Sequence, residues 1–122
     1  MSQRKFTAFA SAARTATPTA FDGVADEAVK GMIVIIDVTV DPAAASVVFT
    51  VSGRDPASDK LYTLLVSAAI VATGTTVLRI GPELTASANV VAKDFIPAHW
   101  TIAPVHADTD SITYSVGVNL VS

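Results

Sequence analysis

The strongest constraint on the fold is an alternation of apolar and polar residues close to the C-terminal end of the sequence. Between residues 112 and 121 the even-numbered positions are apolar, and most odd-numbered positions are small or polar. The apolar positions are Ile112, Tyr114, Val116, Val118 and Leu120, alternating with Thr113, Ser115, Gly117 and Asn119. Because residues two apart on an extended strand point to the same side, this pattern predicts a β-strand with one buried face.

The same period of two recurs from residue 31 onward. Residues 32–40 alternate in this way, and the second side changes from apolar Ile33 and Ile35 to polar Asp37 and Thr39. Two more strands are predicted where Val47, Phe49 and Val51, and where Tyr62, Leu64 and Val66, recur at every second position. Weaker candidates are residues 76–80, 89–93 and 100–105. Pro104 moves the last of these toward a sheet edge, because proline cannot donate to a ladder.

Turn signals separate these candidate strands at short intervals. They are Asp41-Pro42, Asp55-Pro56, Thr73-Gly74, Gly81-Pro82, Ile96-Pro97 and residues 108–111. Short strands rich in Val, Ile and Thr bury their apolar faces against one another in two-sheet folds. We therefore predict an all-β domain over residues 31–122, an antiparallel β-sandwich or jelly roll of about seven or eight strands.

Residues 1–30 read differently and are predicted to form an extended N-terminal arm. The segment is rich in Ala, Thr and Ser and has no sustained period, apart from a helical turn considered for residues 22–30. It carries the basic residues Arg4, Lys5 and Arg14 and the aromatic residues Phe6, Phe9 and Phe21. Phenylalanines are costly in a free tail, so we expect the arm to dock onto its own domain or onto a neighbour, with a frayed terminus as the alternative.

Composition argues against several classes of function. The 122 residues include no cysteine, which excludes disulfides and thiolate chemistry, and no apolar run is long enough to span a bilayer. The formal net charge is -3, and the part that follows the basic arm is acidic, which is unfavourable for binding nucleic acid. The N-terminal segment resembles a signal peptide only faintly, because its apolar stretch is short and interrupted.

No set of residues indicates a catalytic reaction. His106, Asp108 and Asp110 are the best metal candidates, but residues 107–111 equally have the composition of a hairpin loop in which Asp side chains cap turn amides. His99 and His106 are the only histidines, and neither a nucleophile elbow nor a phosphate-binding glycine loop accompanies them. We expect no enzyme activity, metal, cofactor or small-molecule substrate.

Aromatic residues offer one further binding hypothesis. Trp100, Tyr62 and Tyr114 could form a stacking platform for a sugar, but both tyrosines fall in register with apolar neighbours, which indicates core or core-edge positions. Trp100 is the freest of the three, and we expect it to pack in the core or between subunits. The charged loop at residues 54–60 is typical of a solvated turn.

Residues 13–121 resemble a family of small structural proteins encoded in the virion-assembly region of tailed bacteriophages. The likeness rests on residues 13–19, 49–56 with 62–65, 72–75, 80–82, Pro97 with Trp100, 106–108 and 111–116. These are strand and turn signatures without a catalytic fingerprint. Two loops depart from the family pattern: Asp59 stands where glycine is usual after the loop serine, and Glu83 follows Gly81-Pro82.

The resemblance implies a virion component, a capsid decoration or minor capsid protein that assembles in the host cytoplasm and sits on the capsid surface. Its partners would be the major capsid protein and sister subunits, with a homotrimer suggested by the three-fold positions of icosahedral shells. The residues predicted to contact partners are Arg4, Lys5, Phe6, Phe9, Arg14, Phe21 and Trp100. The alternatives are a neck or tail connector and a carbohydrate-binding or receptor-binding β-sandwich.

Overall fold

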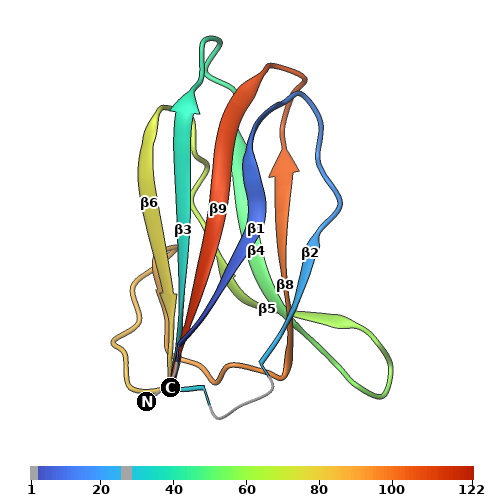
Figure 1. Cartoon of the computed structure of the whole chain (residues 1–122), viewed down its shortest axis with the longest axis vertical. Coiled ribbons are helices and arrows are strands. Elements are labelled where there is room, and N and C mark those ends of the chain that lie inside the picture. The colour runs from blue at the N-terminus through green and yellow to red at the C-terminus, as the bar shows by residue number, and fades with distance from the viewer. Residues whose placement is uncertain (1–2, 26–28) are drawn as a thin grey trace.

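The chain folds as two β-sheets packed face to face (Figure 1). The computed structural model describes residues 3–25 and 29–122. Its strands are β1 (Gln3–Arg14), β2 (Phe21–Val24), β3 (Gly31–Val40), β4 (Val47–Arg54), β5 (Leu61–Val66), β6 (Gly74–Ile80), β7 (Val91–Ala92), β8 (His99–His106) and β9 (Ile112–Val121). In this described part of the chain there is no helix that could cross a membrane.

The two sheets have five and four strands. The larger sheet has the order β1-β9-β3-β6-β7, and the smaller has the order β2-β8-β4-β5. All pairs are antiparallel except the short β6 and β7 pair, which is parallel. The predicted all-β antiparallel sandwich is therefore confirmed.

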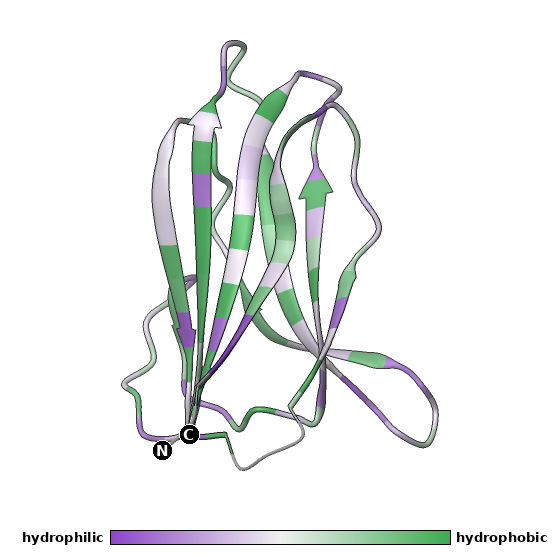
Figure 2. Ribbon diagram, in the orientation of Figure 1, coloured by the Kyte–Doolittle hydropathy of each residue, from purple (hydrophilic) through white to green (hydrophobic). Residues whose placement is uncertain are grey.

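The core lies between the two sheets and is built by the alternation seen in the sequence. The buried positions of β9 are the even-numbered ones, and β3 buries Met32, Val34, Ile36 and Val38 in the same way. Figure 2 shows the resulting bands of hydrophobic and hydrophilic residues along β3 and β9. Each of these strands turns one row of alternating apolar side chains into the space between the sheets. Burial of this row, and not a local backbone preference, therefore determines which face points inward.

β8 shows why Pro104 is tolerated in the middle of the smaller sheet. Its first half is interior, paired with β2 through Ile102 and with β4 on the other side. Beyond Ile102 β2 has ended, so β8 is a local edge at Pro104, where Phe49 of β4 is its partner. The expectation of an edge position thus holds for the second half of the strand only.

β5 differs from its predicted orientation. Leu65 is buried, whereas Val66 is exposed and Tyr62 is 47% exposed. Of the expected inward row, Leu64 is partly buried against the core, and the prediction is wrong for Val66. The cause is a register shift against β4 between Val51 and Ser52, which leaves Leu64 without a ladder partner and places Tyr62 and Leu65, the partners of Gly53 and Val51, on the same side of the strand. Tyr62 pairs with Gly53 and is half exposed, so it takes a core-edge position and not a core one.

The described residues of the predicted arm lie along one edge of the sandwich. Residues 3–14 form β1, which pairs with β9 as the edge strand of the larger sheet, and Phe21–Val24 forms β2 at the edge of the smaller one. Neither strand was predicted. The helical turn considered for residues 22–30 is not formed at 22–24, which belong to β2, and residues 26–28 lie outside the described residues.

Candidate interaction surface

Three of the predicted contact residues form an aromatic cluster inside the molecule. The ring of Phe6 lies 5.4 Å from that of Trp100 in an edge-to-face arrangement, and Phe21 lies 5.8 Å from Trp100. Trp100 is 0% exposed, and the two phenylalanines are partly buried against the core. In this structure the aromatic residues of the arm therefore dock onto the chain's own sandwich, and the indole is not available to stack on a sugar.

Two glycines make room for this cluster. Gly23 of β2 and Gly53 of β4 are the ladder partners of Trp100 on its two sides. A side chain at Gly23 would collide with the indole, and one at Gly53 would collide with the ring of Tyr62. The large rings therefore lie over backbone that has no side chain of its own.

Arg14 ties the end of β1 to β9. Its guanidinium donates to the backbone oxygens of Ala10 at 2.6 Å, Ala12 at 3.1 Å and Tyr114 at 2.7 Å. It also lies 4.5 Å from the centre of the Tyr114 ring and 5.6 Å from that of Phe9, which is buried. The register of β1 shifts between Phe9 and Ala12, and Ala10, whose oxygen accepts from Arg14, lies within this irregular stretch.

His106 lies beside this group. Its Nε2 atom is 2.9 Å from the hydroxyl oxygen of Tyr114, and among the described residues its buried Nδ1 atom has no hydrogen-bond partner. Burial, and then the nearby positive charge of Arg14, lower the pKa of His106 below its usual 6.5, against a smaller opposing effect of Asp108. Burial also raises the pKa of Tyr114 to about 12.

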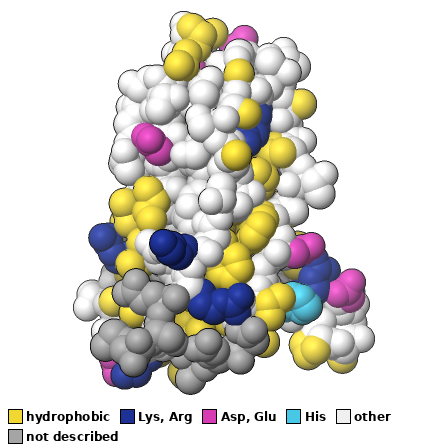
Figure 3. All heavy atoms as spheres, in the orientation of Figure 1, with side chains coloured by type: hydrophobic (Ala, Val, Ile, Leu, Met, Phe, Trp, Pro, Cys, Tyr) yellow, Lys and Arg dark blue, Asp and Glu magenta, His cyan; other side chains and the backbone are white. Residues whose placement is uncertain are grey.

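The two remaining basic contact residues have different surroundings. The guanidinium carbon of Arg4 lies 5.3 Å from the centre of the Phe6 ring, so this cation covers the aromatic cluster from the outside. Lys5 is exposed and points to the opposite, outward face of the larger sheet. In Figure 3 several Lys and Arg side chains gather in the lower half of the face of the molecule that is shown.

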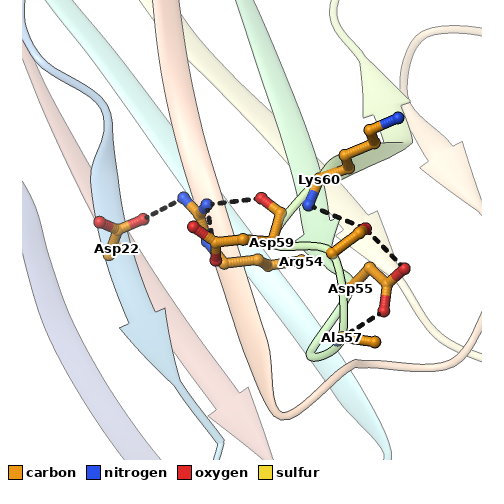
Figure 4. A network of polar contacts seen from close by, with 7 residues as sticks. Asp22, Arg54, Asp55, Ala57, Asp59 and Lys60 are labelled. Atoms are coloured by element: carbon orange, nitrogen blue, oxygen red, sulfur yellow. Dashed lines mark hydrogen bonds and ion pairs between the residues drawn. The ribbon is translucent and has the colours of Figure 1, made fainter.

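The charged loop between β4 and β5 is organised by Arg54 (Figure 4). The guanidinium forms ion pairs with Asp59 at 3.2 Å and with Asp22 of β2 at 3.4 Å, and it donates to the backbone oxygen of Asp59 at 3.0 Å. Sequence reasoning missed Asp22, because β2 and β4 are far apart in the chain and meet only by flanking β8. These ion pairs are exposed and contribute little to stability.

The rest of the loop is a tight turn. The amide of Ala57 and the hydroxyl of Ser58 donate to the Asp55 carboxylate at 2.9 and 2.8 Å, and they lower its pKa. Asp59 has a φ of 66°, in the left-handed region that favours glycine and that Asp tolerates better than most residues. This backbone conformation gives a physical reason for the glycine expected at position 59.

The residues considered for a metal site do not converge. His106 contacts Tyr114, and Asp108 accepts a hydrogen bond from the backbone amide of Asp110 at 3.1 Å, as in a capped turn. Across residues 3–25 and 29–122 no group of three or more histidine, cysteine or acidic residues could hold a metal ion. The geometry of residues 107–111 is therefore that of a loop in which Asp108 caps a turn amide.

Comparison with known proteins shows a shared fold. No protein-family model and no curated protein sequence matches the chain. Among solved structures, a chain in the structure of infectious bursal disease virus, Gx strain, is similar with a TM-score of 0.50 and 9% sequence identity. The likeness covers 98% of this chain but only 32% of the viral one. At this identity the comparison shows the β-sandwich fold alone.

Proposed function

We propose that the chain is a structural component of a tailed-bacteriophage virion, a capsid decoration or minor capsid protein that binds the outside of the head shell. The observation that carries the proposal is a fold that extends over almost the whole chain and resembles that of a chain in a virus structure. The strand and turn signatures shared with small phage virion proteins direct the proposal to tailed phages.

The distribution of polar groups supports a role in packing rather than turnover. The space between the sheets is filled by apolar side chains, and the only polar residues buried in the described part of the chain are Ser52, Ser67 and Thr101. The Nε2 atom of His106 lies within hydrogen-bond distance of the Tyr114 hydroxyl, and His99 is exposed. We therefore propose that the protein has no enzyme activity and that its partners are the major capsid protein and sister subunits, including a homotrimer.

Binding to shells tests the proposal directly. Purified protein is mixed with expanded empty capsids of the parent phage at physiological salt, and the capsids are pelleted. We expect the protein to co-sediment and to saturate at a fixed ratio to the major capsid protein. Protein that stays in the supernatant at every concentration would contradict a role on the shell.

Copy number separates decoration from a connector in the neck or tail. A decoration protein is expected at hundreds of copies per particle, whereas a ring-forming connector is expected at about a dozen copies or fewer. Quantitative mass spectrometry of intact virions measures this ratio. A count of about a dozen copies or fewer would indicate a connector in the neck or tail and contradict a decoration role.

A further inference from the structure

We propose that the outward face of the five-stranded sheet is the docking surface, and that it takes a protein surface with an apolar centre bordered by carboxylates. The inference rests on the proposed function and deepens it, because the partner is then an acidic patch on the shell. The face combines three features of protein interfaces: a row of cations, an apolar centre and a cavity at one end.

The cations lie in one row across the sheet. Lys5 of β1, Asn119 of β9, Ile33 of β3 and Arg79 of β6 are successive ladder partners. Their neighbours Leu120, Met32 and Ile80 are core residues, so this row points outward. Lys5 and Arg79 are three strand spacings apart, about 14 Å, which sets the separation of the carboxylates that they would meet.

The centre of the face is apolar. Ile35 of β3 has Val77 of β6 and Gly117 of β9 as its outward-facing ladder partners, and Ile33 follows on the same side. All four are partly exposed. A side chain at Gly117 would meet no atom closer than 3.9 Å, so the surface beside Ile35 is open. This apolar centre favours a protein partner over a polyphosphate.

A cavity of about 210 Å³ continues the face at the end where β3 begins and β6 ends. It shares Ile33 and Arg79 with the surface described above, and Val121 and Leu84 help to make it apolar. Cavities of about 150 Å³ with apolar walls accommodate an aromatic ring. The cavity can therefore receive one large apolar side chain of the partner as an anchor.

The charges on the face are available to a partner. Within the described residues neither Lys5 nor Arg79 forms an ion pair, and both are exposed. Of the acidic residues that the structure describes, Asp37 lies farther along β3 and accepts a hydrogen bond from Thr75, and Glu83 lines the cavity together with Lys30. In contrast, Arg54 on the smaller sheet is already paired with two carboxylates.

Matched charge reversals test the proposal by co-sedimentation of the full chain with expanded capsids. Arg79→Glu and, separately, Lys5→Glu are expected to raise the dissociation constant at least tenfold and to weaken its salt dependence. Lys60→Glu is the control, because Lys60 is an exposed cation in the β4–β5 loop and its reversal changes the net charge equally. Equal binding by Arg79→Glu and Lys60→Glu would overturn the inference while leaving the proposed function in place.

A second pair of variants tests the apolar centre. Ile35→Thr is expected to weaken binding, whereas Val105→Thr, on an exposed position of β8, is expected to leave it unchanged. Light scattering during size-exclusion chromatography reports the oligomeric state of each variant. If Ile35→Thr dissociates an oligomer without reducing capsid binding, a second copy occupies the face and the inference is wrong. If the unmodified chain does not bind capsids, the proposed function is overturned and this inference with it.

Discussion

The indole of Trp100 occupies the space that any side chain at Gly23 would need. The two residues are ladder partners on β8 and β2, and β2 belongs to the segment that leads from the N-terminal strand back into the sandwich. The absence of a single methyl group thus allows this part of the chain to pack over the largest core side chain.

Gly23→Ala is expected to destabilise the fold by about 2 kcal/mol, because the new methyl group would overpack against a fully buried ring. Gly117→Ala is the matched control, since its methyl group would enter open space on the outward face of β9. That variant should be neutral or slightly more stable, because alanine loses less conformational entropy on folding. Urea denaturation of the two variants measures the difference, and equal stabilities would contradict this packing.

The turn at Asp59 predicts a second contrast. Asp59→Gly relieves a left-handed backbone conformation but removes the exposed ion pair with Arg54, so its net effect should stay within about 0.5 kcal/mol. Asp59→Val also removes the ion pair and does not relieve the backbone conformation. It should lower the free energy of unfolding by about 1–2 kcal/mol, because a β-branched residue is disfavoured at this φ. Thermal unfolding compares the two, and a valine variant as stable as the glycine variant would argue against the turn.

Stability should depend on pH through His106. Its pKa is lower in the folded chain than the usual 6.5, so the unfolded state binds more protons as the pH falls through that value. The contribution is complete above pH 6.5 and is lost on acidification. Urea denaturation at a series of pH values should show a smaller decrease for His106→Asn than for the unmodified protein. His99→Asn is the matched control for replacing a histidine at an exposed position, and an equal effect of the two variants would contradict the role of His106.

Arg14 should stabilise the edge formed by β1. Arg14→Met keeps an unbranched apolar side chain in place of the aliphatic stem but removes the three hydrogen bonds to backbone oxygens, at an expected cost of about 1–3 kcal/mol. Arg14→Lys should restore only part of this, because an ammonium group lacks the planar fork of donors. Lys5→Met is the control for loss of a cation from the same strand. If Arg14→Met and Lys5→Met unfold at the same urea concentration, the proposed stabilising role is wrong.

The outcome for the candidate surface differed between residue types. Arg14 and Trp100 stood out in the sequence as a cation and a large aromatic residue, but composition cannot tell whether such a side chain meets a partner or its own chain. In the structure Arg14 binds backbone oxygens and Trp100 is in the core. Arg79 was not predicted as a contact residue. It lies beside Ile33 and in the same row as Lys5 only because strands that are distant in sequence pair with one another.

The sequence by itself determined the fold class, the turns and the inward faces of β3 and β9, because alternation with period two is a local pattern that burial on one side directly imposes. Only the tertiary structure decided that residues 3–14 join the larger sheet and that β5 turns Leu65 inward. It alone also places Lys5 and Arg79 on one face. The physical reason is that strand order and register arise from contacts between distant segments, and a bulge or a partner strand can override the pattern within any one of them.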